Sequence, residues 1–121
     1  MQRISPIEAK ALMDQGWTYL DVRTEQEFRA GHPAGAVNVP FLVQGPPGLG
    51  LEPNPHFLST VQAKFKTDAQ LVCGCMAGGR SFKAATALEQ AGYTQIADQR
   101  AGFGGNQNEP GWASAGLPVE Q

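Results

Sequence analysis

Short apolar runs alternate along the chain with longer segments in which apolar residues recur every three or four positions. The apolar runs predict strands, and they lie at residues 3–4, 17–22, 36–39, 71–73 and 95–98. The segments between them predict helices, which we expect at residues 6–15, 25–28, 55–65 and 81–91. Strands that alternate with helices indicate an α/β fold, with a parallel sheet and helices on both of its faces.

Two of the predicted helices begin with residues that satisfy free backbone N–H groups. Ser5 and Glu8 have the spacing of a capping box, and Pro6 suits the first helical position. Thr24 and Glu27 repeat the same spacing before the second helix. The side of the first helix that we expect to face the core carries Ile7, Ala11 and Leu12.

The segment 71–81 carries the chemistry that the rest of the chain is expected to support. A buried strand runs into a loop with Cys75, Gly78 and Gly79, and a helix follows. Free N–H groups at the start of a helix stabilise an anion, and a thiolate is an anion. We therefore expect Cys75 to act as a thiolate nucleophile, with loop amides turned toward it and positive charge added by Arg80.

The loop sequence Cys-Met-Ala-Gly-Gly-Arg-Ser, residues 75–81, resembles the active-site loop of single-domain rhodaneses, which are sulfurtransferases. The resemblance implies that Cys75 accepts sulfane sulfur as a persulfide and passes it to cyanide or a thiol. The family spacing Cys-x4-Arg selects Cys75, whereas Cys73 lies inside the apolar run and is expected to be a packing residue. The binding loop implied by the resemblance consists of Met76, Ala77, Gly78, Gly79 and Arg80.

The segment 20–40 is similar to a second signature of the same family, Asp-x-Arg…Glu-Phe…Gly-His…Gly-Ala-x-Asn-x-Pro. We interpret its polar residues as a structural network, with an i,i+4 pair of Arg23 and Glu27 and with His32 bound to a backbone carbonyl. Asp21 stands at the end of a strand, where parallel sheets bind ligands, and is kept as a residue that could line the site. The resemblance covers nearly the whole chain and implies a five-stranded parallel sheet, the rhodanese-like fold.

Composition narrows the possible partners and cofactors. A chain of 121 residues is expected to form a single domain, 1–121, and a net charge of −2 without basic runs argues against nucleic acid. Two cysteines and two distant histidines, His32 and His56, do not suggest a metal, and no other cofactor is implied. No apolar stretch has the length of a membrane span or a signal peptide. A reactive free thiol suits a reducing compartment, so a cytoplasmic location is expected.

Two segments are less well defined by the sequence. Residues 44–55 are rich in glycine and proline, and they either overhang the site or form a plain surface connection stiffened by proline. Residues 105–112 are polar and predict no regular structure, although Trp112 at their end is expected in the core.

Three functions are compatible with these patterns. The first is sulfur transfer from a small anionic donor, such as thiosulfate, to a thiol or cyanide, with a protein persulfide as another possible partner. The second is a phosphatase or arsenate reductase, but those loops have the longer form Cys-x5-Arg, which neither cysteine has to Arg80. The third is a non-catalytic binding or persulfide-carrier module. Because Met76 and Ala77 add no positive charge, we expect weak use of thiosulfate relative to another donor.

Overall fold

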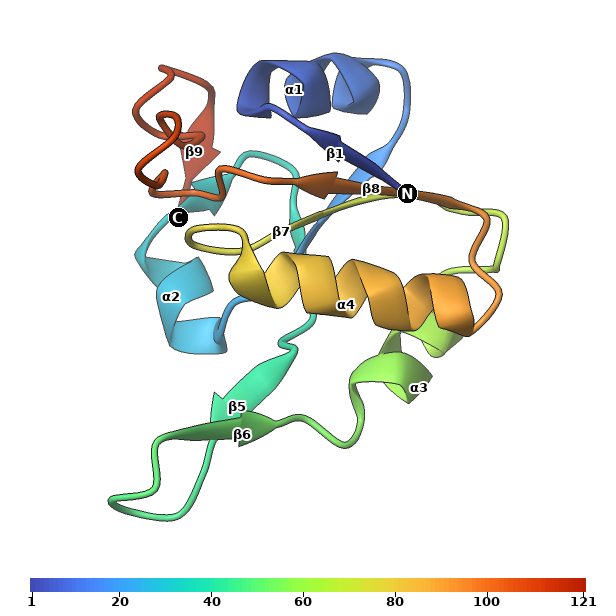
Figure 1. Ribbon diagram of the computed structural model, residues 1–121, viewed down its shortest axis with the longest axis vertical. Coiled ribbons are helices and arrows are strands. Elements are labelled where there is room, and N and C mark those ends of the chain that lie inside the picture. The colour runs from blue at the N-terminus through green and yellow to red at the C-terminus, as the bar shows by residue number, and fades with distance from the viewer.

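A computed structural model describes residues 1–121 and shows one central sheet of five parallel strands (Figure 1). The expected fold class is therefore confirmed. Across the sheet the strands follow the order β1 (Gln2–Ile4), β8 (Gln95–Gln99), β7 (Gln70–Gly74), β2 (Thr18–Asp21) and β4 (Val37–Asn38). The carboxyl ends of β7 and β2 meet at the same edge, since Asp21 pairs with Gly74.

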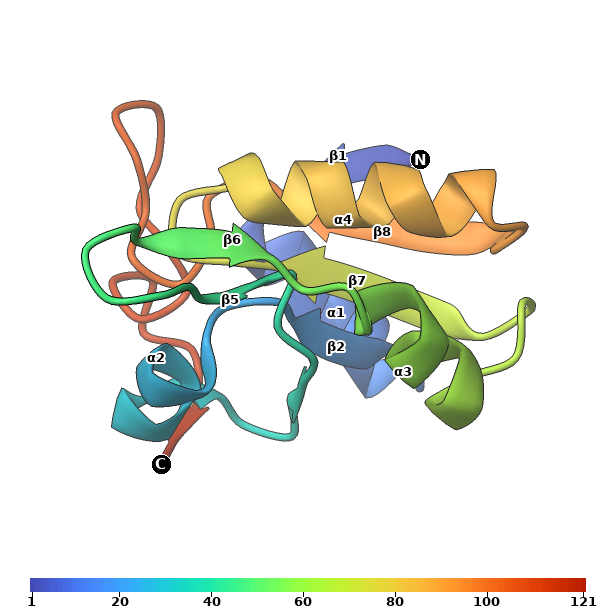
Figure 2. The same ribbon diagram turned by 90° about the horizontal axis from the view of Figure 1, so that it is seen from below.

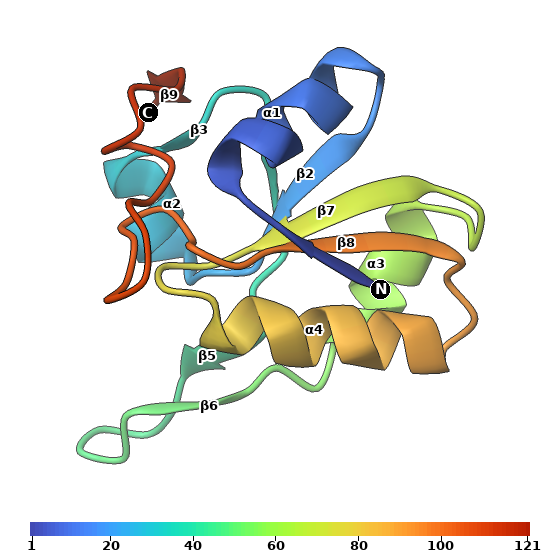
Figure 3. The ribbon, with the colours of Figure 1, turned by 45° about the horizontal axis from the view of Figure 1, so that its top comes forward.

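Helices cover both faces of this sheet, as Figure 3 shows, with α1 on one side and α3 and α4 on the other. Each face has its own hydrophobic core, and Trp112 is fully buried in the core on the α1 side. The remaining helix, α2, lies beyond the carboxyl ends of the strands, close to the start of α4 (Figure 1). The helices span α1 (Pro6–Asp14), α2 (Glu25–Ala30), α3 (Phe57–Lys64) and α4 (Gly79–Gln90).

Both predicted capping boxes are present, but the buried side of α1 differs from the prediction. Ile7 is 67% exposed and Ala11 is also exposed, whereas Pro6 and Ala9 are buried and Leu12 is half-buried. A small residue such as Ala9 allows the helix backbone to lie close to the sheet, so the helix is turned to bury its smaller side chains. The prediction for Ile7 and Ala11 is therefore wrong.

Helix α3 begins later than the sequence suggested. The Asn54 side-chain oxygen accepts a hydrogen bond from the His56 N–H two residues on, at 2.9 Å, in a turn that precedes the helix. This turn places the first helical residue at Phe57, whose side chain is buried against the core on the α4 side.

Two small antiparallel sheets were not predicted. The glycine- and proline-rich segment contains a hairpin of β5 (Leu42–Gln44) and β6 (Leu51–Pro53), closed by a hydrogen bond from the Gly45 N–H to the Gly50 carbonyl. This hairpin projects from the body of the molecule (Figures 1 and 2). The other sheet joins β3 (His32–Pro33) to the C-terminal β9 (Val119–Glu120). None of the helices has the length and apolar character needed to cross a membrane.

Candidate active site

Cys75 is the first residue after β7, in the short loop that leads into α4. Its side chain is buried, and its sulfur accepts a hydrogen bond from the Gly78 N–H at 3.1 Å. The same sulfur lies 3.5 Å from the hydroxyl oxygen of Ser81, in the first turn of α4. A strand end, a tight loop and a helix start thus converge on one sulfur atom, as the sequence predicted.

The loop is held in place by residues 102–106, a segment that overlaps the start of the stretch 105–112 for which the sequence predicted no regular structure. Three consecutive carbonyls of the loop accept hydrogen bonds from this segment. Cys75 O is bound by the Phe103 N–H at 2.7 Å, Met76 O by the Gly104 N–H at 2.9 Å, and Ala77 O by the Asn106 side-chain amide at 3.1 Å.

These bonds determine where the loop amides point. In a trans peptide the N–H points away from the preceding carbonyl, so carbonyls turned toward residues 102–106 direct the following N–H groups the other way. The Gly78 N–H, which follows the Ala77 carbonyl, is the one that reaches the Cys75 sulfur. The segment 102–106 therefore orients the loop for an anionic sulfur.

Two glycines permit this close packing. Gly78 has a φ of +112°, and a Cβ built there would lie 2.2 Å from the carbonyl oxygen of Arg100. Gly102 has a φ of +71°, and its Cβ would lie 2.3 Å from the carbonyl oxygen of Met76. Side chains at either position would clash with the backbone, so both glycines are required by the geometry of the loop.

Arg80 is engaged by Glu27 in α2. Its two terminal nitrogens donate to the two carboxylate oxygens of Glu27, at 2.7 Å and 3.0 Å. The hydrogen bonds from Arg80 lower the pKa of Glu27 to about 2. The Arg80 guanidinium is therefore already bound to a carboxylate, so it links α2 to the start of α4.

The pairing predicted between Arg23 and Glu27 is wrong. Arg23 is buried and donates instead to Asp21, with Nη2 2.8 Å from Oδ2, and to the Gly31 carbonyl at 2.7 Å. Its guanidinium also lies over the ring of Phe103, 4.5 Å from the centroid, so it supports the segment behind the active loop.

Asp21 consequently does not line an open site. Its carboxylate is buried and bound to the side chain and backbone N–H of Arg23, which corrects the expectation based on its place at a strand end. His32 behaves as predicted, because its Nδ1 lies 2.7 Å from the Phe28 carbonyl oxygen and its ring stacks on Phe28.

Cys73 is a buried packing residue in β7 and forms no disulfide. Burial raises the pKa of its thiol far above the ordinary value, and the nearby carboxylate of Asp98 adds to this effect. The thiolate of Cys73 is therefore disfavoured, in agreement with its assignment from the sequence.

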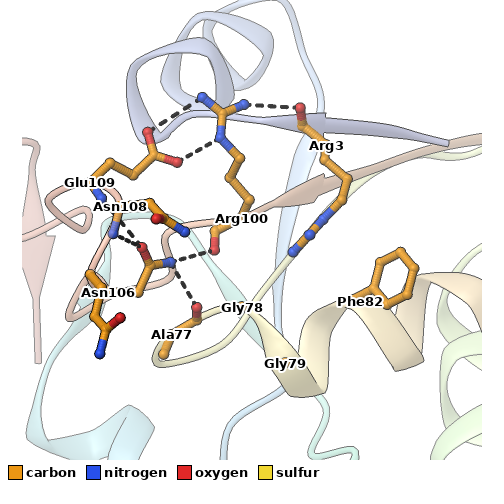
Figure 4. A pocket seen from close by; sticks show the side chains of 10 residues that line it. Arg3, Ala77, Gly78, Gly79, Phe82, Arg100, Asn106, Asn108 and Glu109 are labelled. Atoms are coloured by element: carbon orange, nitrogen blue, oxygen red, sulfur yellow. Dashed lines mark hydrogen bonds and ion pairs between the residues drawn. The ribbon is translucent and has the colours of Figure 1, made fainter.

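One surface pocket is lined in part by the loop, and a second contains Glu27, the carboxylate that binds Arg80. One has a volume of about 530 Å³ and lies between the end of β1, the loop and residues 106–109 (Figure 4). Its wall includes Ala77, Gly78 and Gly79 of the loop. The other pocket lies between α2 and the β5–β6 hairpin, with Glu27 in its wall. The hairpin thus borders a pocket near the loop.

Residues 5–109 match the Rhodanese-like domain family, and the chain belongs to this family. The chain is 40% identical over 117 residues to Thiosulfate sulfurtransferase 16, chloroplastic, of Arabidopsis thaliana, covering 97% of this chain and 91% of that protein. It is also 40% identical over 113 residues to Rhodanese-like domain-containing protein 15, chloroplastic, of the same plant, covering 93% of this chain but 58% of that protein. The family is thus a sulfurtransferase family, as the loop sequence indicated.

The fold agrees with solved structures as well. The crystal structure of Rv0390 from M. tuberculosis superimposes with a TM-score of 0.84 at 26% identity, covering 100% of this chain and 98% of the other.

The expected cytoplasmic location is contradicted by the relatives. The two Arabidopsis proteins at 40% identity are both named chloroplastic. The reason for the error is that a free thiol indicates a reducing environment without distinguishing one such compartment from another.

Proposed function

We propose that this protein transfers sulfane sulfur through a persulfide on Cys75. The observation that carries the proposal is the 3.1 Å hydrogen bond from the Gly78 N–H to the Cys75 sulfur, in a loop whose carbonyls are bound on the opposite side. Such an arrangement favours negative charge on sulfur, both in the thiolate and in the persulfide that it forms.

The reaction has two steps. The Cys75 thiolate attacks the outer sulfur of a donor such as thiosulfate, the sulfur–sulfur bond breaks, and its electron pair leaves with sulfite. A thiophilic acceptor, cyanide or a thiolate, then attacks the terminal sulfur of the persulfide and releases the Cys75 thiolate. Loop amides from Met76 to Arg80 would stabilise the charge as it moves between these atoms. The name of the relative Thiosulfate sulfurtransferase 16 supports a donor of this class.

The loop length favours sulfur transfer over phosphate chemistry. Four residues separate Cys75 from Arg80, one fewer than in phosphate-binding cysteine loops. The shorter loop leaves less room around the sulfur for a tetrahedral oxyanion. The Arg80 side chain, which would clamp such an oxyanion, is bound to Glu27.

Intact-mass spectrometry tests the proposal directly. Wild-type protein incubated briefly with thiosulfate or polysulfide should gain one sulfur, about 32 Da, and should lose it on addition of cyanide. Cys75→Ser should gain nothing, and Cys73→Ser is the matched control that should behave as wild type. Absence of any gain in the wild type would reject sulfur transfer and favour a binding module, and a gain retained in Cys75→Ser would show that another residue carries the sulfur.

A further inference from the structure

Asp98 is a buried carboxylate with no assigned part in sulfur transfer. It lies in β8, opposite Cys73 of β7, and its side chain is fully buried. One carboxylate oxygen, Oδ2, accepts a hydrogen bond from the Arg3 Nε of β1 at 2.9 Å, whereas Oδ1 has no hydrogen-bond partner. A buried carboxylate oxygen without a partner costs free energy, so its presence calls for a functional explanation.

The Ser81 hydroxyl connects this carboxylate to the reactive sulfur. Ser81 is fully buried in the first turn of α4, and its Oγ accepts a hydrogen bond from the Cys75 thiol, with the sulfur and the oxygen 3.5 Å apart. The hydroxyl donates to the Gly78 carbonyl at 3.3 Å, and it is also close enough to Asp98 for a hydrogen bond that lowers the pKa of that carboxyl group. A hydroxyl that accepts from one group and donates to another can pass a proton between them.

The arginines closest to the reactive sulfur are already paired with carboxylates. The pairs are Arg80–Glu27, Arg23–Asp21 and Arg3–Asp98. Because Cys75 is only 2% exposed, its thiolate would add a negative charge without a cation of its own to a buried site. If Asp98 takes up the thiol proton, the total charge stays the same and Arg3 offsets the thiolate instead. The Arg3 guanidinium extends from β1 toward Gly78, and its Nη2 would lie 3.5 Å from a Cβ placed on that glycine (Figure 4).

The surroundings of Asp98 allow it to gain and to lose a proton. Burial raises its pKa, and the hydrogen bonds from Ser81 and Arg3 act in the opposite direction. The groups that face the carboxylate are Arg3 from β1, the Ser81 hydroxyl from α4 and the Cys73 thiol from β7. Cys73 stays neutral, because burial raises the pKa of its thiol far above the ordinary value. The opposing effects on Asp98 leave its carboxyl group free to titrate together with Cys75.

We propose that Asp98 is the internal proton acceptor of Cys75 and that Ser81 is the bridge between them. The inference rests on the proposed function. The Cys75 thiol gives its proton to Ser81 Oγ while the Ser81 hydroxyl passes its own proton to Asp98 Oδ1, which leaves a thiolate, a hydroxyl and a neutral carboxylic acid. No electrons are exchanged, and the same path returns the proton when the sulfur becomes a thiol again. The persulfide is also an anion, so it keeps Asp98 protonated.

Infrared difference spectroscopy at neutral pH tests where the proton lies. It compares Cys75 loaded with sulfur from thiosulfate, where the terminal sulfur is anionic, with Cys75 alkylated by iodoacetamide, where the sulfur is a neutral thioether. The loaded wild type should show the C=O stretch of a protonated carboxylic acid, and the alkylated wild type should not. Asp98→Asn should lack this band in both forms. Ser81→Ala should lose most of it, because the sulfur and the carboxylate are then no longer bridged.

The pH dependence of single-turnover sulfur loading gives a second readout. Two groups that share a proton titrate in two steps, so the wild-type profile between about pH 5 and about pH 9 should have two inflections. Asp98→Asn should have one inflection, with a rate that falls about tenfold per pH unit below it, as for a single ionising thiol. Glu109→Gln removes a different carboxylate that is paired with an arginine, Arg100, and should keep the wild-type profile.

The outcomes separate the role of Asp98 from the proposed function. Loaded wild type without the carboxylic acid band, or a pH profile that Asp98→Asn leaves unchanged, would overturn the role of Asp98 while sulfur transfer stands. A band of full strength in Ser81→Ala would overturn the bridge. Failure of the wild type to take up sulfur at any pH would instead reject the proposed function itself.

Discussion

Arg80 and Glu27, which are 53 positions apart in the sequence, form a bidentate ion pair. The pair ties the start of α4, and with it the active loop, to α2 on the other side of the site. Glu27 also accepts hydrogen bonds from the backbone and hydroxyl of Thr24, as part of the capping box of α2. One carboxylate thus organises two helix starts, and Arg80 is a residue that positions the loop.

Glu27→Gln tests the strength of this link, because glutamine retains an oxygen for the capping box but cannot form the ion pair. The pKa of Glu27 is lowered to about 2, so its contribution is fully present above the unfolded value of about 4.3 and is lost as the pH falls toward 2. We expect the variant to be less stable by about 1 kcal/mol at pH 7, a value reduced for partial exposure.

Urea unfolding at pH 7 and at pH 3 provides the measurement. The difference between wild type and Glu27→Gln should shrink at pH 3. The control Glu25→Gln removes an exposed pair with Arg29 on the same helix and should change stability by a few tenths of a kcal/mol at most. A difference that stays constant between the two pH values would contradict the assignment.

Adjacent glycines offer a second test, because their surroundings differ. Gly78 has a positive φ and its Cβ would clash with the Arg100 carbonyl, whereas Gly79 has open space and begins α4. We expect Gly78→Ala to lower stability by roughly 2 kcal/mol or more and to abolish sulfur loading. Gly79→Ala should leave stability within about 0.5 kcal/mol of wild type, or raise it, since alanine favours a helix. Thermal unfolding and the mass assay would show the contrast, and similar behaviour of the two variants would refute this account of the loop.

Asn106 provides a test of the segment behind the loop. Its side chain donates to the carbonyls of Ala77 and Arg100 and accepts from two backbone N–H groups, all close to 3 Å. Asn106→Ala should speed hydrogen exchange of the loop amides at residues 76–79 and lower stability by about 1 kcal/mol. Gln107→Ala is the matched control, since the Gln107 side chain forms no hydrogen bonds. Unchanged exchange in Asn106→Ala would show that the loop keeps its shape without this support.

The sequence predicted those interactions whose residues lie close together in the chain, and it missed those between residues far apart in the chain. The capping box of Ser5 and Glu8 lies within four consecutive residues, and the strand, loop and helix around Cys75 follow one another directly, so both were predictable. Glu27 was paired with Arg23 on helical spacing, but its partner is Arg80, which only the folded topology brings near. The short strands of the β5–β6 hairpin are too brief to show an alternating pattern.

The loop-binding segment was missed for the same reason. The Gly-rich sequence 102–105 is typical of a flexible turn when seen alone. Its backbone N–H groups bind the carbonyls of Cys75 and Met76, about 28 residues earlier, and such a pairing leaves no mark on local sequence. The only sequence signal was glycine itself at positions 78 and 102. The folded structure shows why Gly102 is needed there, because its backbone lies against the Met76 carbonyl.

The two cysteines should differ sharply in reactivity although one residue separates them. Burial raises the pKa of Cys73 far above neutrality, so its thiolate is scarce in the folded protein at pH 8 and forms readily only after unfolding. Iodoacetamide should therefore label one site in native wild type, none in native Cys75→Ser, and Cys73 only in urea, as peptide mass spectrometry would show. Cys73→Ala should retain sulfur loading and lose about 1–2 kcal/mol of stability through the cavity left in the core. Rapid labelling of Cys73 in the native protein would mean that β7 opens far more often than its buried contacts allow. It would also contradict the assignment of Cys75 as the only reactive thiolate.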